Sequence, residues 1–147
     1  MYRRPKVFLD TNIIMDILKG DRPSSPASTQ ILQFIRSGKL EGQICSQSIV
    51  DSAYLCARDR QNFQPFSQAV RFMLDYINLN SIDYISLNQA LLNPKDDFED
   101  AALYACAKDS CCDALITHNK DFRRRYEGED PHIRFFTPEE LVTLMTE

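Results

Sequence analysis

The chain has 147 residues, with 17 lysines and arginines against 21 aspartates and glutamates, so its formal net charge is -4. This length is typical of one domain with its own hydrophobic core, and we expect residues 1–147 to form a single domain. The mild acidity argues against a protein that holds nucleic acid through bulk positive charge. It does not exclude an enzyme that meets nucleic acid through metal ions.

Cysteine usage and hydropathy favour a cytoplasmic protein. The five cysteines are an odd number without CxxC spacing, which fits reduced, packed side chains. The apolar run at residues 7–9 is far shorter than the core of a signal peptide. No later run reaches the roughly 18 apolar residues of a membrane span. We therefore expect no membrane partner.

The first half of the chain alternates short apolar runs with segments in which apolar residues recur at helical spacing. This pattern predicts strands at residues 7–9 and 41–45, and helices at residues 13–20, 28–37, 49–57 and 65–77. A loop with two prolines, Pro23 and Pro26, separates the first two helices.

The second half of the chain continues the alternation. It predicts strands at residues 82–85, 114–117 and 133–136, a short helix that ends before Pro94, and helices at residues 96–110 and 137–145. Short strands that alternate with helices favour an α/β fold around a mainly parallel sheet, because crossover helices join parallel neighbours.

The first candidate functional residue is Asp10, which directly follows the apolar run 7–9. It is expected at the carboxyl end of a central strand, where open α/β sheets place their ligands. Thr11 and Asn12 then supply a hydroxyl and an amide at the start of the next helix. The alternative is that Asp10 serves only as the N-cap of that helix.

A second group of acids lies at residues 96–100, ahead of an alanine-rich helix. Asp97 and Asp100 are three residues apart, so on a helix they share one face. Some of these acids are explained by the helix dipole, which favours negative charge in a first turn. Asp100 borders the alanines that let this helix approach the sheet closely, whereas Asp96 and Glu99 are expected to be solvated.

A third acid, Asp121, follows the predicted strand 114–117 at what should be the same edge of the sheet. Alone it is an ordinary loop acid. Together with Asp10 and Asp100 it would complete a cluster of carboxylates, whose mutual repulsion is costly without a cation. Oxygen ligands of this kind suit Mg²⁺ or Mn²⁺ rather than Zn²⁺.

In this order the motifs resemble the PIN domain, a family of metal-dependent nucleases that includes the VapC toxins. The matching pieces are residues 8–12, 48–54, 97–101 and 116–122. The resemblance implies a three-layer α/β/α fold in which acids bind one or two Mg²⁺ or Mn²⁺ ions and cut RNA. Carried over by position, it implies that Asp10, Asp100 and Asp121 are catalytic metal ligands, directly or through water.

The resemblance also implies supporting roles. Residues that would orient ligands, waters or a phosphate are Thr11, Asn12, Thr117 and Asn119. Asp97 would support the ligands. Asp51 stands where the family most often has Glu, and its side chain is one methylene shorter, so a water would have to bridge the gap. Asp51 or Asp121 is the expected acceptor of the proton from the attacking water.

A basic segment follows Asp121. It comprises Lys120, Arg123, Arg124 and Arg125, and we expect it to contact the RNA backbone beside the metal site. The alternative is an ordinary solvated face of a helix or loop.

The expected function is a metal-dependent endoribonuclease, the toxin of a toxin–antitoxin pair, with RNA as substrate, an antitoxin protein as partner and a homodimeric state. One alternative is a PIN nuclease of RNA processing or decay without an antitoxin. The other is a degenerate PIN domain that binds RNA or a protein without cutting, an option that Asp51 in place of Glu keeps open.

Overall fold

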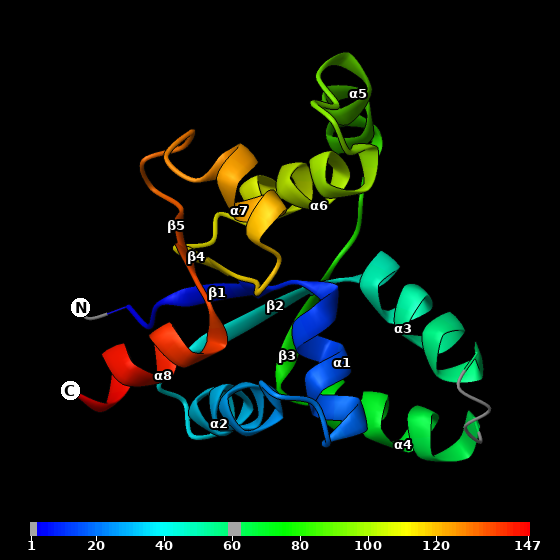
Figure 1. Ribbon diagram of the computed structural model, residues 1–147, viewed down its shortest axis with the longest axis vertical. Coiled ribbons are helices and arrows are strands. Elements are labelled where there is room, and N and C mark those ends of the chain that lie inside the picture. The colour runs from blue at the N-terminus through cyan, green and yellow to red at the C-terminus, as the bar shows by residue number, and fades with distance from the viewer. Residues whose placement is uncertain (1–2, 59–62) are drawn as a thin grey trace.

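The computed structural model describes residues 3–58 and 63–147, and in this part of the chain five parallel strands form one sheet in the order β3-β2-β1-β4-β5 (Figure 1). The strands are β1 (Lys6–Leu9), β2 (Glu41–Cys45), β3 (Ile77–Asn80), β4 (Ala114–Ile116) and β5 (Arg134–Phe136). All strands point the same way, so their carboxyl ends share one edge, and the α/β prediction with a parallel sheet is confirmed.

Helices cover both faces of the sheet. They are α1 (Thr11–Lys19), α2 (Ser25–Arg36), α3 (Ser46–Arg58), α4 (Phe63–Leu74), α5 (Tyr84–Leu92), α6 (Phe98–Asp109), α7 (Lys120–Tyr126) and α8 (Pro138–Thr146). Figure 1 shows α5, α6 and α7 on one side of the sheet and α1, α2, α4 and α8 on the other. This is the expected three-layer α/β/α fold. No helix in the described part of the chain is long and apolar enough to span a bilayer.

The central strand β1 explains the two-sided core. Val7 and Leu9 pack into the cluster formed with α1, α2 and α8, while Phe8 between them packs into the cluster under α6 and α7. Each of the three is at most 1% exposed. Successive side chains of a strand point to opposite faces, so a short continuous apolar run is what a strand covered on both faces requires.

The prediction of the third strand is wrong. The strand is Ile77–Asn80, which pairs with β2, and residues 82–85 contain the start of α5 instead. Asp83 caps that helix, since its carboxylate accepts a hydrogen bond of 2.8 Å from the amide of Ser86. The side chain of Tyr84 is 80% exposed on the helix surface. An N-cap acid therefore outweighs the apolar run that suggested a strand.

Gly42 on β2 lies where the sheet and α2 meet at close range. A Cβ atom at this position would lie 2.7 Å from Cδ1 of Ile35, a buried side chain of α2. We expect Gly42→Ala to lower the free energy of unfolding by about 1–2 kcal/mol, because Ile35 must leave its packed position. Urea denaturation measures the change. The exposed α2 variant Thr29→Ala is the control, and an unchanged Gly42→Ala midpoint would show that Ile35 moves freely.

Candidate functional site

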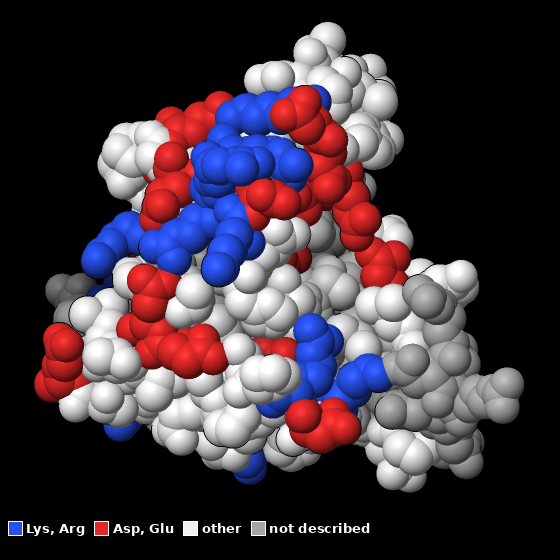
Figure 2. Space-filling model, in the orientation of Figure 1, with Lys and Arg blue, Asp and Glu red and all other residues white. Residues whose placement is uncertain are grey.

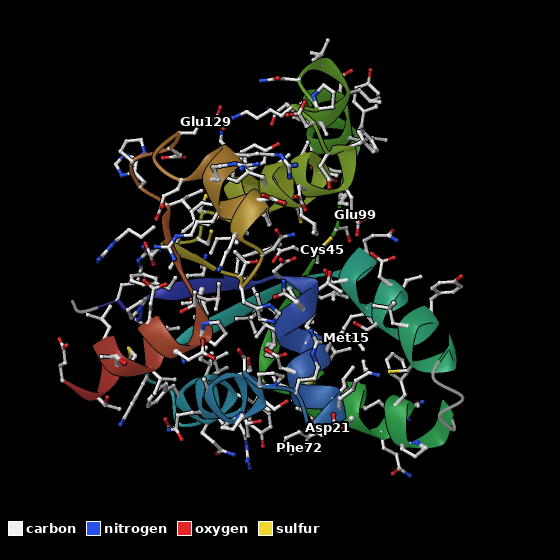
Figure 3. All side chains as sticks on the ribbon, viewed as in Figure 1. Met15, Asp21, Cys45, Phe72, Glu99 and Glu129 are labelled. Atoms are coloured by element: carbon white, nitrogen blue, oxygen red, sulfur yellow. The ribbon has the colours of Figure 1, made fainter. Side chains whose placement is uncertain are left out.

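An open hollow of about 270 Å³ lies at the carboxyl edge of the sheet, next to the ends of β1 and β4. The residues that line it are Asp10, Thr11, Asn12, Met15, Arg22, Leu55, Asp97, Glu99, Asp100, Leu103 and Asn119. Figure 3 labels Met15 on α1 and Glu99 at the start of α6, which mark two of its sides. Asp10, Asp97, Asp100 and Asn119, predicted from three separate segments of the sequence, thus meet in one hollow.

Asp10 is buried at the end of β1, with 5% of its surface exposed. Its carboxylate accepts hydrogen bonds from the amide of Thr11 (2.7 Å), the hydroxyl of Thr117 (2.7 Å) and the side-chain amide of Asn12 (3.2 Å). Burial nevertheless raises its pKa, and these hydrogen bonds oppose the shift. Asp10 is therefore the N-cap of α1, as the alternative interpretation expected. Its second oxygen, Oδ2, is also held by Thr117 and Asn12 and lies beside the hollow.

Asn12 and Thr11 are held by neighbours of different elements. The Thr11 hydroxyl donates to Ser48 Oγ on α3 at 2.8 Å, and Asn12 Nδ2 lies 3.4 Å from the Thr117 hydroxyl. Asn12 Oδ1 is buried and has no hydrogen-bond partner among the described residues. A buried amide oxygen costs free energy when it is unpaired, so this atom suits a ligand or water in the hollow.

Two acids reach the hollow from the start of α6. Asp97 caps the helix by accepting a hydrogen bond of 3.0 Å from the amide of Asp100. Asp100 is 7% exposed, and its Oδ2 pairs with Arg125 Nη1 at 3.0 Å. Burial, together with the negative charges of Asp97 and Asp10, raises the pKa of Asp100 to about 6 despite the guanidinium. The acids therefore repel one another across the hollow.

Glu99 is exposed, as expected, and it also lines the same hollow. Burial and the charges of Asp51, Asp97 and Asp10 raise its pKa. Asp51 lies on α3, accepts a hydrogen bond of 3.0 Å from Gln47, and shares a neighbouring hollow with Glu99. The only sequence signal that could have placed Glu99 at the hollow is its position one residue before Asp100, in the first turn of α6.

Asp121 lies outside the lining of the hollow. Its side chain is 63% exposed and pairs with Arg124 at 3.1 Å. The preceding Asn119 lines the hollow instead and caps α7, since its Oδ1 accepts hydrogen bonds from the amides of Asp121 and Phe122. Asp121 lies in the first turn of α7, and its exposed carboxylate is not among the groups that line the hollow.

The basic segment lies on α7, and Figure 2 shows its side chains gathered beside an acidic edge of the surface. Arg123 pairs with Glu127 (3.0 Å) and Glu140 (2.6 Å), and Arg125 pairs with Asp100. Lys120 is exposed. Three of the four predicted RNA contacts, including Arg124, are therefore already bonded to carboxylates within the protein, and the role of this segment stays a prediction.

The donor set of the hollow fits a hard divalent cation. Its side chains offer carboxylate, amide and hydroxyl oxygens, and no sulfur or imidazole of the described residues lines it apart from the thioether of Met15. Among the described residues, no group of three His, Cys, Asp or Glu side chains is close enough together to hold a metal ion in this conformation. The raised pKa values of Asp10, Glu99 and Asp100 reflect burial and negative charge that a bound cation would offset.

A family model described as "PIN domain" matches residues 6–121 of the chain. This range contains both strand ends that form the hollow and the start of α6. A search of curated protein sequences finds no match.

Several solved structures share the fold. One is a toxin–antitoxin complex from Klebsiella pneumoniae, with 21% identity and a TM-score of 0.62 over 90% of this chain and 97% of that one. Another is VapC20 from Mycobacterium tuberculosis, described as a toxin that cleaves the sarcin–ricin loop, with 13% identity and a TM-score of 0.64 over 81% and 94%. A third is VapBC2 from Rickettsia felis, bound to a promoter DNA fragment, with 16% identity and a TM-score of 0.64 over 90% and 98%.

Proposed function

The chain belongs to the PIN domain family, and on that premise we propose that it is a Mg²⁺- or Mn²⁺-dependent endoribonuclease, the toxin of a toxin–antitoxin pair. The observation that carries the proposal is the hollow itself, where Asp10, Asp97, Glu99 and Asp100 line one surface at the carboxyl edge of the sheet. Two of the four, Asp10 and Asp100, are buried. Carboxylates that repel one another at close range suit a divalent cation, which can in turn polarise a phosphodiester.

Asp10 and Asp100 are the proposed ligands of the cation. When bound, one or two such ions would supply a water of lowered pKa and neutralise charge on the phosphodiester oxygens. Thr117 and the Thr11 amide fix the orientation of the Asp10 carboxylate through their hydrogen bonds. Asp121 stays a predicted ligand, and its exposed position outside the lining favours a contact through water.

Glu99 is the carboxylate of the hollow best suited to accept a proton from water. Its raised pKa makes it a stronger base than an ordinary glutamate, and the causes are burial first and then the charges of Asp51 and Asp97. Asp51 therefore acts on Glu99 through its charge. This arrangement lets the shorter Asp51 contribute where the family most often has Glu.

The toxin assignment rests on the structural neighbours, which include a toxin–antitoxin complex and VapBC2. We propose that an antitoxin protein binds this chain and that the chain acts in the cytoplasm as a homodimer. Light scattering of the purified chain, alone and with the product of an adjacent small reading frame, tests both assemblies. The alternative of RNA processing or decay predicts no such adjacent partner.

The deciding experiment is cleavage of a mixed RNA pool by the purified chain. Parallel reactions contain Mg²⁺, Mn²⁺ or EDTA, and any partner that co-purifies is first removed under denaturing conditions and the chain refolded. Cuts that need the cation support the proposal, and mapping them identifies the substrate. No cutting by a folded sample in either cation would reject the nuclease and favour a domain that binds RNA or protein without cleaving it.

A further inference from the structure

Arg22 is the one Lys or Arg side chain among the described residues that line the hollow. It lies in the loop between α1 and α2, whereas the acids Asp97, Glu99 and Asp100 come from the start of α6. Figure 2 shows a small group of basic side chains over the end of α1, apart from the larger group on α7. None of the roles assigned so far uses Arg22.

A buried carboxylate holds the Arg22 side chain. Asp16 on α1 is 1% exposed, and its Oδ1 lies 3.1 Å from Arg22 Nε. The other oxygen, Oδ2, accepts a hydrogen bond of 2.7 Å from the Ser28 hydroxyl and lies 3.3 Å from His118 Nε2. Since Asp16 is anchored on α2 and next to β4 as well, it is a fixed point rather than a mobile surface acid.

The backbone of the loop is held at the same place. The amide of Arg22 donates to Ser25 Oγ at 3.0 Å, and the Ser25 hydroxyl donates to the carbonyl of Asp16 at 2.6 Å. Gly20, with a φ of 75°, turns the chain out of α1 just before this loop. Both the main chain and the side chain of Arg22 are thus positioned before any ligand arrives, which lowers the entropic cost of binding.

The guanidinium of Arg22 keeps free hydrogen-bond donors. Only Nε faces Asp16, and the two Nη nitrogens have no ion-pair or hydrogen-bond partner within residues 3–58 and 63–147. The side chain is 31% exposed, so these donors reach solvent at the hollow. By contrast, Arg125 is 18% exposed and its Nη1 is bonded to Asp100 within the site. Arg22 is therefore the more available cation for an anionic ligand.

We propose that Arg22 binds a phosphate of the RNA backbone at the hollow, and that Asp16 positions its guanidinium for this contact. The inference rests on the proposed function, since RNA is the anion that the chain would meet there. A planar guanidinium with two free nitrogens matches two phosphate oxygens, which makes arginine a better phosphate ligand here than lysine. A phosphate held by Arg22 would share the hollow with Asp97, Glu99 and Asp100.

The test is the salt dependence of RNA binding, measured by fluorescence anisotropy with a labelled single-stranded RNA of mixed sequence. The assay contains EDTA, so its readout does not depend on cleavage. Each phosphate contact in single-stranded RNA contributes about 0.7 to the slope of log affinity against log salt. We expect Arg22→Ala to weaken binding about tenfold at low salt and to reduce this slope by about 0.7.

Two further variants separate a phosphate contact from a loss of structure. Arg22→Lys keeps the charge and is expected to retain the slope with an affinity only a few-fold lower. Arg3→Ala is the matched control, because Arg3 also pairs with an aspartate, Asp113, but at the opposite edge of the sheet. It is expected to leave the slope unchanged. Thermal unfolding shows whether each variant is folded. If Arg22→Ala shows no unfolding transition, Arg22→Gln takes its place.

The positioning role of Asp16 is tested by a double-mutant cycle. Asp16→Asn is expected to weaken RNA binding in the parent chain but not in the Arg22→Ala chain. Equal weakening in both would reject the positioning role. An unchanged slope in Arg22→Ala would overturn the phosphate contact, even if the parent cuts RNA with Mg²⁺. If the parent chain does not bind RNA at all, the phosphate contact is rejected as well. If the parent binds RNA but does not cut it, only the proposed nuclease activity is rejected.

Discussion

Asp10→Asn is expected to reduce metal-dependent RNA cleavage by about three orders of magnitude or more, because a cation that polarises water and phosphate contributes several kcal/mol to the transition state. The substitution keeps the size of the side chain and removes the charge that would hold the cation. Single-turnover cleavage of the RNA identified from the mixed pool measures the loss. Asp75→Asn, an exposed acid in the turn before β3, is the control and should cut like the parent.

The same substitution is expected to leave the fold intact in EDTA. Burial raises the pKa of Asp10, so its charged form is disfavoured in the folded chain and a neutral side chain removes that cost. The new amide can still accept from the Thr11 amide. Its nitrogen would face the Thr117 hydroxyl, which can accept instead of donate, and Asn12. The Oδ1 of Asn12 has no hydrogen-bond partner among the described residues and can also turn to accept. We expect an unchanged or slightly higher midpoint of thermal unfolding, and equal cleavage by a folded variant would contradict the site.

Much of the fold is predictable because the strands are covered on both faces. Phe8 and Leu9 are fully buried, and a continuous apolar run followed by Asp10 carries that information in sequence. The strand Ile77–Asn80 escaped prediction because only Ile77 is buried and the exposed Leu79 gives no clear alternation. A short strand with one buried anchor is easily read as the end of the preceding helix.

The acids of the hollow show a second limit of sequence analysis. Asp10 and Asp100 are recognisable because each borders a buried element. Glu99 and Asp121 both lie in the first turn of a helix, but only Glu99 lines the hollow. The spacing of acids in the sequence does not determine which way a side chain of a first turn points. In α7 that turn exposes Asp121, and Asn119 occupies the lining instead. Whether an acid faces the hollow is decided by the capping geometry rather than by residue type.

The role of Arg22 depends on long-range contacts that no local pattern carries. In sequence Asp16 is a single acid among the apolar residues of α1, and the pattern does not indicate its partners. In the structure Ser28 and His118 close over it from α2 and from the end of β4. A buried carboxylate without partners would be costly, so these contacts offset the cost of burying Asp16 beside the loop that carries Arg22.

Divalent cation is expected to stabilise the folded chain. At about 100 times the dissociation constant, Mg²⁺ or Mn²⁺ should raise the free energy of unfolding by about 2.7 kcal/mol if it binds only the folded state. For a chain of this size the midpoint of thermal unfolding would rise by roughly 5–10 °C. Asp10→Asn and Asp100→Asn should each lose most of this rise. No shift with either cation in the parent would contradict a divalent site in the hollow.

The size of that rise should depend on pH. The pKa of Asp100 in the folded chain is raised to about 6 by burial and by Asp97 and Asp10, above its ordinary value of 3.8. Without cation, Asp100 therefore adds stability below about pH 4, on the order of 2 kcal/mol, and this is lost as the pH rises through about 6. A cation competes with that proton. The rise in midpoint should be small at about pH 5 and grow through pH 6, and a constant rise across this range would mean that Asp100 is not a ligand.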